Sequence, residues 1–537
     1  MCKDGGKHGT NACNSGQCHL NKLRLRVVSP DGASLHFTFL HQSIIIQQRT
    51  YNAPATINEN APMLSELKLL DATLHRTDTQ TRMPFRFGIA VMTAAPHVFL
   101  KCRYEIGGQI VTGIATEGLL PRWFDKSPEK QADQEVDEML QVIRQAVAFA
   151  RQAAPAPAFD FWRQVYQAQV AWAAEQSFPS LLAQFGVTMV ERTLLDALAR
   201  AEQCNLATLL RENRVGLDLA TIHPELKGRT SAEFLPAQPL TKIIARHTVG
   251  LSDPLTAADI TPENRIDDGL PQTLEECIRA YGLRHFKLKA QGDVDLDLDR
   301  LRAVAQVITA HCGNNYAFTL DGNEQYREFP RFVELWDGIQ ADAALSAFFE
   351  NLIFIEQPLH RSVALDPAIA HIADWENGPP VIIDESDAEL SALEQALQLG
   401  YAGTSHKNCK GILKATAHRC LINHRNATEN TNRYQMSGED LVNIGPVALL
   451  QDLAAQAALG ITSVERNGHH YFHGLTPFPR EISQLMLAQH GDLYTEMDNG
   501  FARVNITNGE LNLTSLNAAP FGVGVEVPLN GFKELSL

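Results

Sequence analysis

Charged side chains end a series of short apolar runs between residues 285 and 411. The runs are HFKLK (285–289), FTLDGN (318–323), LIFIEQP (352–358), VIIDES (381–386) and TSHKNCKG (404–411). Carboxylates gathered in one cavity can bind a hard divalent cation, and lysines beside them can move protons. This chemistry requires a fold that brings the ends of the five runs together.

The spacing of these charges indicates alternating strands and helices. Successive charges, from Lys289 to Lys407, are separated by enough residues for one strand and one helix, and apolar residues recur at helical spacing in the segment 295–311. Strands joined in this way run parallel, and buried parallel strands read as continuous apolar runs such as LIFI and VII. We therefore predict an α/β fold with a TIM-like (β/α)7β or (β/α)8 barrel, in which strand-end residues converge at the C-terminal face.

The chain is longer than one barrel requires. With 537 residues it leaves room for a second domain, and strand patterns followed by helical patterns predict an α+β N-terminal capping domain. The predicted order is an N-terminal extension, the capping domain, the barrel, and a C-terminal segment returning to the capping domain, at residues 1–64, 65–235, 236–490 and 491–537.

The N-terminal extension carries two features. Its first part contains Cys2, Cys13 and Cys18 among Gly, Asn and Lys residues, which we interpret as a flexible tail, with a Cys/His metal site as the alternative. The alternating pattern that follows, with a turn at Pro30–Gly32, predicts a β-hairpin.

Composition limits the partners. The formal net charge of −16 repels phosphate backbones and disfavours nucleic-acid binding. No apolar run is long enough to span a membrane, and nine scattered cysteines form no disulfide framework. We expect a soluble, cytoplasmic protein, monomeric or homo-oligomeric, that acts on a small carboxylate-containing metabolite.

Three of the charges are carboxylates on successive predicted strands: Asp321, Glu356 and Asp384. Carboxylates that meet in a cavity repel one another unless protons or a cation compensate them. Oxygen ligands favour Mg²⁺ over Zn²⁺, with Mn²⁺ as an alternative to Mg²⁺. The competing interpretation pairs each acid with a basic neighbour.

The lysines suggest proton transfer. Lys287 and Lys289 point to the same face of a strand, where each ammonium group is expected to lower the pKa of the other. Lys407 ends a strand on the far side of the acids. A metal that binds a substrate carboxylate and a lysine that removes the α-proton would together form and stabilise an enediolate. The alternative is that these lysines only neutralise the acids.

The motifs KLK, LDGN, IEQP, IDES and HKNCKG resemble, in order and spacing, the strand-end motifs of the enolase superfamily, of the mandelate racemase/muconate lactonizing enzyme type. MPFRFG and LPRWFDK resemble segments of its capping domains. The resemblance implies that the three carboxylates bind Mg²⁺, that Lys289 and Lys407 are the two acid/base groups, and that Lys287 tunes Lys289. This arrangement is similar to the muconate-lactonizing subgroup of cycloisomerases, succinylbenzoate synthases and epimerases. The mandelate racemase subgroup uses a histidine on the seventh strand, and MSGED offers none.

Further residues are expected at the substrate. They are Asn323, Glu385, His406 and Arg86. His406, like the histidines at 469, 470 and 473, either polarises the substrate or packs within the structure. Arg86 either meets an anionic substrate group or forms a structural salt bridge.

We therefore predict an enzyme that removes a proton α to a carboxylate, with racemisation or epimerisation as the leading reaction because two opposed lysines serve two faces. If Lys407 only stabilises charge, syn elimination, acid-sugar dehydration or cycloisomerisation is favoured instead. Two hypotheses of another class are a barrel metallohydrolase, whose first strand should carry a histidine pair where IIARHTV has one histidine, and a noncatalytic metal- or metabolite-binding protein.

Overall fold

The computed structural model describes residues 26–28, 34–36, 64–87, 90–127 and 129–537, in two units, residues 1–63 and 64–537. In the first unit, strands β1 (Arg26–Val28) and β2 (Ser34–His36) pair antiparallel, in agreement with the expected hairpin. The cysteines of the N-terminal tail lie outside the described residues.

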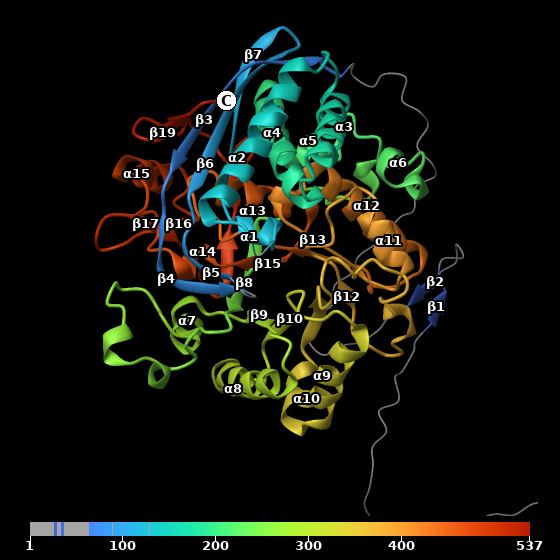
Figure 1. Cartoon of the computed structure of the whole chain (residues 1–537), viewed down its shortest axis with the longest axis vertical. Coiled ribbons are helices and arrows are strands. Elements are labelled where there is room, and N and C mark those ends of the chain that lie inside the picture. Colours follow the sequence, from blue (N-terminus) through green and yellow to red (C-terminus); the bar gives the residue numbers. More distant parts are fainter. Residues whose placement is uncertain (1–25, 29–33, 37–63, 88–89, 128) are drawn as a thin grey trace, which may run out of the picture. The chain divides into compact units, whose positions relative to one another are not determined.

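Eight parallel strands form the barrel of the second unit (Figure 1). They are β8 (Lys242–Val249), β9 (His285–Lys289), β10 (Ala317–Asp321), β11 (Leu352–Glu356), β12 (Val381–Ile382), β13 (Gly403–His406), β14 (Gln435–Gly438) and β15 (Ser463–Arg466). Their order is β12-β11-β10-β9-β8-β15-β14-β13, and a parallel bridge between Ile383 and Thr404 closes the ring. The predicted barrel with a capping domain is confirmed.

Helices surround the barrel strands. They are α7 (Leu274–Tyr281), α8 (Val294–Cys312), α9 (Phe329–Ala341), α10 (Ala343–Phe349), α11 (Ala392–Gln398), α12 (Ile412–Thr428), α13 (Ala448–Leu459), α14 (Gly468–Tyr471) and α15 (Arg480–Gln489). Local signals define several ends: α7 starts at a capping box of Thr273 and Glu276 and stops at Gly282, whose φ of 65° suits glycine. On β9, Phe286 and Leu288 are buried apolar side chains on the face opposite to that of the two lysines, so the strand is held by packing while its charges face inward.

The capping domain combines a sheet with helices. Its sheet has the order β19-β3-β6-β7, from Lys533–Leu535, Leu67–Thr77, His97–Ile106 and Gln109–Gly118, and β4 (Gln80–Phe87) pairs with β5 (Ala90–Ala94). The helices are α1 (Pro121–Phe124), α2 (Ala132–Gln152), α3 (Ala158–Gln176), α4 (Ser180–Ala201), α5 (Leu206–Arg211) and α6 (Leu219–Ile222). Helix α4 is buried along nearly its whole length, and two glycines permit this. A Cβ at Gly113 of β7 would lie 1.9 Å from the Thr193 carbonyl oxygen of α4, and one at Gly186 of α4 would lie 2.0 Å from the Val142 carbonyl oxygen of α2.

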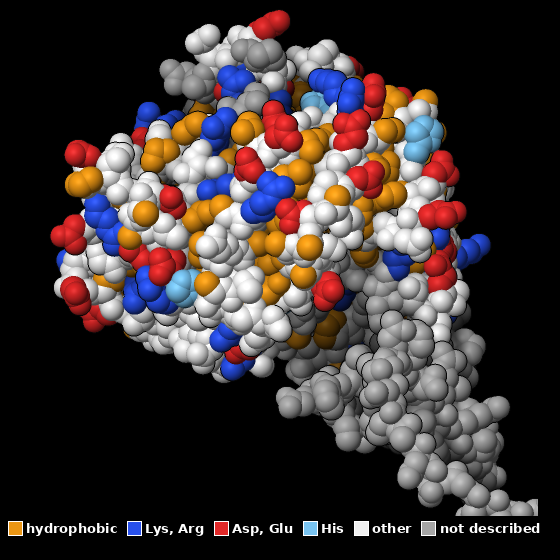
Figure 2. Space-filling model, turned by 90° about the horizontal axis from the view of Figure 1, so that it is seen from below, with side chains coloured by type: hydrophobic (Ala, Val, Ile, Leu, Met, Phe, Trp, Pro, Cys, Tyr) orange, Lys and Arg blue, Asp and Glu red, His pale blue; other side chains and the backbone are white. Residues whose placement is uncertain are grey.

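The C-terminal segment contacts both parts of this unit. After β16 (Tyr494–Glu496) and β17 (Ala502–Val504), strand β18 (Glu510–Asn512) pairs antiparallel with β8 of the barrel, α16 (Thr514–Asn517) follows, and β19 joins β3 of the cap. On the face shown in Figure 2, acidic and basic side chains alternate, so this face has no continuous basic surface. Among the described helices, none combines the length and the apolar character needed to cross a membrane.

Candidate active site

Charged side chains from most strands of the barrel converge on one cavity of about 50 Å³. Its polar lining includes Lys289, Asp321, Asp384 and Lys407, and Glu356 lies beside it, bonded to Lys287. The register explains this convergence, since Asp321 stands opposite both Lys289 and Glu356 on the neighbouring strands. Parallel strands that end in charges at one level place those charges around a common centre.

Lys287 is the electrostatic centre of the cavity. Its buried Nζ lies 2.8 Å from Glu356 Oε1, 2.9 Å from Glu465 Oε2, and 3.1 Å from both Asp321 Oδ2 and Glu439 Oε2. Burial alone would lower the pKa of Lys287, but the four carboxylates raise it well above its ordinary value.

The expected lowering of each lysine pKa by the other lysine is therefore outweighed, and both pKa values are raised. Lys289 donates to Asp321 Oδ2 at 2.7 Å. Burial and the Lys287 charge each act to lower the pKa of Lys289, yet Asp321 and more distant carboxylates leave it raised. Sequence spacing gave the lysine pair correctly but did not reveal how many acids surround it.

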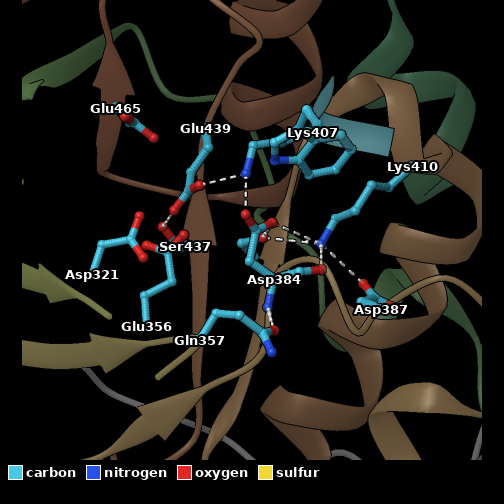
Figure 3. A network of polar contacts seen from close by, with 12 residues as sticks. Asp321, Glu356, Gln357, Asp384, Asp387, Lys407, Lys410, Ser437, Glu439 and Glu465 are labelled. Carbon is cyan, nitrogen blue, oxygen red and sulfur yellow. Dashed lines mark hydrogen bonds and ion pairs between the residues drawn. The ribbon is translucent and has the colours of Figure 1, made fainter. Parts of the chain in front are cut away.

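Lys407 occupies the opposite wall. Its Nζ lies 2.6 Å from Asp384 Oδ2 and 2.7 Å from Glu439 Oε2, as Figure 3 shows, and 4.9 Å from the centre of the Trp123 ring. In the ring of eight strands, β9 and β13 are four strands apart in either direction, so Lys289 and Lys407 enter the cavity from opposite sides. The carboxylate-bearing strands β10, β11 and β12 lie between them.

The donor set fits a hard divalent cation. Carboxylate oxygens of Glu356, Asp384 and Glu439 lie within 4.8 Å of one another. Two of the three predicted ligands are in this group, whereas Asp321 is not, and Glu439 is its third member. Glu356 Oε2 is buried and has no hydrogen-bond partner, which is a costly state for a carboxylate unless a cation or proton compensates it. Burial and the neighbouring Glu439 raise the pKa of Glu356 well above its ordinary value. Oxygen donors of this kind suit Mg²⁺.

Comparison with known proteins identifies the barrel. Residues 270–478 match the family model described as Enolase C-terminal domain-like. This stretch of the barrel is similar to the C-terminal domain of enolase-superfamily proteins. The match agrees with the resemblance of the strand-end motifs, and the muconate-lactonizing subtype stays a prediction. No curated protein matches the sequence.

Solved structures share the fold of this barrel and its cap at low identity. The N-succinyl Arg/Lys racemase from Bacillus cereus is 15% identical, with 84% of this chain and 97% of that chain covered and a TM-score of 0.52. The muconate lactonizing enzyme from Pseudomonas fluorescens is 17% identical, with 87% and 96% covered and a TM-score of 0.50. The dipeptide epimerase from Enterococcus faecalis, complexed with Mg and a dipeptide, is 14% identical, with 75% and 92% covered and a TM-score of 0.50. These three neighbours are enzymes by their descriptions.

Two acids of the cavity were not predicted from the sequence. Glu439 follows β14 and bridges Lys287 and Lys407, while Ser437 donates to its other oxygen at 2.6 Å. Glu465 on β15 pairs with Lys287. Both follow the same rule as the other charges, because each stands at or near the end of a barrel strand. Their strands, QMSG and SVER, are short and polar, so no apolar run marked them.

The other predicted residues divide between the cavity and its surroundings. Asn323 and Glu385 line the cavity, and burial together with Glu324 and Asp384 raises the pKa of Glu385 to about 7. His406 is buried outside the cavity lining, with Nε2 3.1 Å from Asn408 Oδ1, because Ser405 and Lys407 take the inward face of the strand. The hypothesis that His406 touches substrate has no support in this geometry.

The remaining predicted groups lie outside the lining. Arg86 on β4 is exposed, and its neighbour Phe85 lines the cavity instead. His473 Nε2 lies 3.0 Å from the Asp268 carbonyl oxygen. His469 and His470 form a separate cluster with His247, in which His247 and His470 are buried and His469 is half-buried.

The capping domain closes one wall of the cavity through Phe85 and Trp123. Arg361 of the barrel fixes this wall by donating to the carbonyl oxygens of Trp123 at 2.9 Å and Phe124 at 3.0 Å. Glu324 holds Arg361 in turn, at 2.7 Å from its Nε. The aromatic wall is therefore tied to the strand ends that carry the charges.

Proposed function

We propose that this protein is a Mg²⁺-dependent enzyme that removes and returns a proton on the carbon α to a substrate carboxylate, as a racemase or epimerase. The observation that carries the proposal is the placement of Lys289 and Lys407 on opposite walls of a cavity whose intervening strands end in carboxylates. One lysine can take the proton from one face of the carbon and the other can return a proton to the opposite face.

Asp321, Glu356 and Asp384 are the proposed metal ligands, because they end three adjacent strands. A Mg²⁺ ion held there would supply Lewis-acid stabilisation of the substrate carboxylate. Glu439 approaches from the other side of the ring, where it pairs with Lys287 and Lys407, and we assign it to holding these two ammonium groups. Lys287 serves as the positioning charge beside Lys289.

A second candidate is syn elimination or cycloisomerisation. It is favoured by the surroundings of Lys407, which is held as a cation by two carboxylates and by the face of Trp123. In that case Lys289 alone would transfer the proton and Lys407 would only stabilise negative charge.

The test is exchange of the substrate α-hydrogen in deuterated water, followed by proton NMR with Mg²⁺ present. The compounds are N-acylamino acids, dipeptides, acid sugars and lactonisable dienoates. For a racemase, Lys289→Ala and Lys407→Ala each lower interconversion by about 10²- to 10⁴-fold, the usual contribution of a general acid or base. Each variant loses exchange of the enantiomer whose α-hydrogen faces the replaced lysine and keeps exchange of the other enantiomer.

The control is Lys414→Met, which removes a buried lysine that pairs with Asp387 outside the cavity lining. Exchange of a single enantiomer by the parent protein, lost in Lys289→Ala and retained in Lys407→Ala, would favour the second candidate. Retention of full exchange in both alanine variants would refute proton transfer by these lysines.

A further inference from the structure

A second group of possible metal ligands lies outside the barrel interior. It consists of His247 on β8, Cys277 on α7 and His470 on α14, all buried. The neighbours of His247 along β8 point inward, since Arg246 donates to Ser437 and Thr248 donates to Glu465. His247 therefore points to the other face of the strand. The group is distinct from the carboxylate cavity.

We infer that His247, Cys277 and His470 bind a borderline-soft divalent metal ion of the Zn²⁺ class. One ligand atom from each residue lies within 4.8 Å of the others, and the Cys277 Sγ is 3.5 Å from His470 Nδ1. Two imidazole nitrogens and one thiolate are ligands that Zn²⁺ prefers and Mg²⁺ does not. Three protein ligands leave a fourth position for water or another donor.

The hydrogen bonds around the group place its lone pairs correctly. His247 Nδ1 lies 3.1 Å from His469 Nε2, so donation from His247 to His469 leaves the Nε2 lone pair of His247 for the metal. In this tautomer the proton of His469 is on Nδ1, which is buried and has no hydrogen-bond partner. A histidine that binds a metal ordinarily donates its second ring N–H to such a neighbour.

His470 has a carboxylate near its other ring nitrogen. Its Nε2 lies 3.9 Å from Asp253 Oδ2, which is beyond hydrogen-bond distance, and that carboxylate is fixed by Tyr471 at 2.7 Å and by the amide of Gly250 at 2.8 Å. The Nδ1 atom of His470 therefore faces Cys277, and the carboxylate lies on the opposite side of the ring.

The alternative is a cluster of histidines that only fills space. Two buried imidazoles beside a half-buried one, whose Nδ1 atom is buried and has no hydrogen-bond partner, are costly in an apolar environment unless they have a ligand. Burial lowers the pKa of His247, His469 and His470, so the rings are neutral and retain the lone pairs that a metal requires. Binding would displace the Cys277 thiol proton to solvent.

An ion at this position would act on the capping domain. The Tyr471 ring, next to His470, packs against Phe85 with ring centres 4.2 Å apart, and Arg82 of the same cap strand donates to the His470 carbonyl oxygen at 3.1 Å. Because Phe85 lines the carboxylate cavity, the metal would fix an element that forms the cavity wall.

The test uses the full chain with Cys2, Cys13 and Cys18 replaced by serine, so that tail thiols cannot contribute. Metal-free protein is titrated with Co²⁺ and, separately, with Zn²⁺ followed by elemental analysis. We expect one equivalent of tightly held metal and a thiolate-to-Co²⁺ charge-transfer band in the near ultraviolet, which oxygen ligands of the carboxylate cavity cannot produce.

Cys277→Ser and His470→Asn should each abolish the band and the tightly held equivalent. Cys420→Ser removes an equally buried cysteine outside the group and should retain both. Far-UV circular dichroism checks that each variant is folded. If a variant is not folded, the presence or absence of the charge-transfer band in the parent protein tests the inference. Absence of the band in the parent, or its persistence in Cys277→Ser, would overturn the inference.

Discussion

Replacing Glu356 by glutamine separates a metal-binding role from a structural one. Glu356 is buried, its Oε1 meets Lys287 at 2.8 Å, and its Oε2 has no partner. The two roles predict opposite effects. A structural partner of Lys287 would destabilise the protein when neutralised, whereas a metal ligand held among like charges would not.

The magnitude follows from the distances. At an effective dielectric constant of about 20, the ion pair with Lys287 contributes about 6 kcal/mol, while repulsion by Asp384 and Glu439, within 4.8 Å, costs about 3 kcal/mol each. Attraction and repulsion cancel, and the cost of burying the charge remains. We therefore expect metal-free Glu356→Gln to be as stable as the parent protein, or more stable by about 0 to 2 kcal/mol.

Mg²⁺ should reverse the order of the two proteins. At a Mg²⁺ concentration of about 100 times Kd, the parent gains about 2.7 kcal/mol of stability, and the variant gains little. Thermal or urea unfolding with and without Mg²⁺ measures both quantities. The matched control is Glu465→Gln, another buried acid that pairs with Lys287 but stands on β15, away from the three adjacent strands that carry the proposed ligands; it should keep the Mg²⁺ effect.

Two outcomes would refute the assignment of Glu356. One is a metal-free variant that is less stable by about 3 to 5 kcal/mol, the cost of leaving a buried charge unpaired. The other is a variant that Mg²⁺ stabilises as much as it stabilises the parent.

Two further predictions concern stability alone. Gly186→Ala should lower the free energy of unfolding by about 3 kcal/mol, because its Cβ would lie 2.0 Å from the Val142 carbonyl oxygen. Gly338→Ala is the matched control, because its Cβ meets only the flexible end of Leu298 at 3.0 Å, and it should be neutral or stabilising by up to about 1 kcal/mol. Urea titrations measure both free energies. Burial raises the pKa of Glu191 from 4.5 to about 7, although two amides at the start of α12 donate hydrogen bonds to its carboxylate. The unfolded chain therefore loses this proton at a lower pH than the folded protein, and stability falls as pH rises from about 4.5 to about 7. In Glu191→Gln this fall should be absent, and the stability difference between variant and parent should grow by about 3 kcal/mol from about pH 4.5 to above pH 7; a pH-independent difference would contradict the assignment.

The sequence predicted the barrel and its first charges because the same physical pattern recurs in it. A buried parallel strand must be apolar where it packs against helices, so a charge that directly follows such a run marks the strand end. This held for Lys289, Asp321 and Glu356, which end β9, β10 and β11. Glu439 follows a strand of only four residues and Glu465 lies within another, and these short polar strands make the pattern too weak to be recognised.

Side-chain direction was predictable in principle at two positions. Successive strand residues alternate between faces, so an inward Lys407 requires His406 to face away. An inward Phe85 likewise leaves Arg86 on the outside, as observed. The pKa values of the lysines could not be predicted in this way, because they depend on acids contributed by strands distant in the sequence, such as Glu439 and Glu465.

The capping domain determines how strongly these charges act. Trp123 and Phe85 cover the strand ends with aromatic surface, and Arg361 ties that surface to the barrel. On the other side, Glu191 of α4 accepts bonds from the first amides of α12, directly after the segment that carries Lys407. Electrostatic interactions strengthen where water is excluded. The same contacts that join cap and barrel therefore keep the two opposed lysines buried and fixed relative to the carboxylates between them.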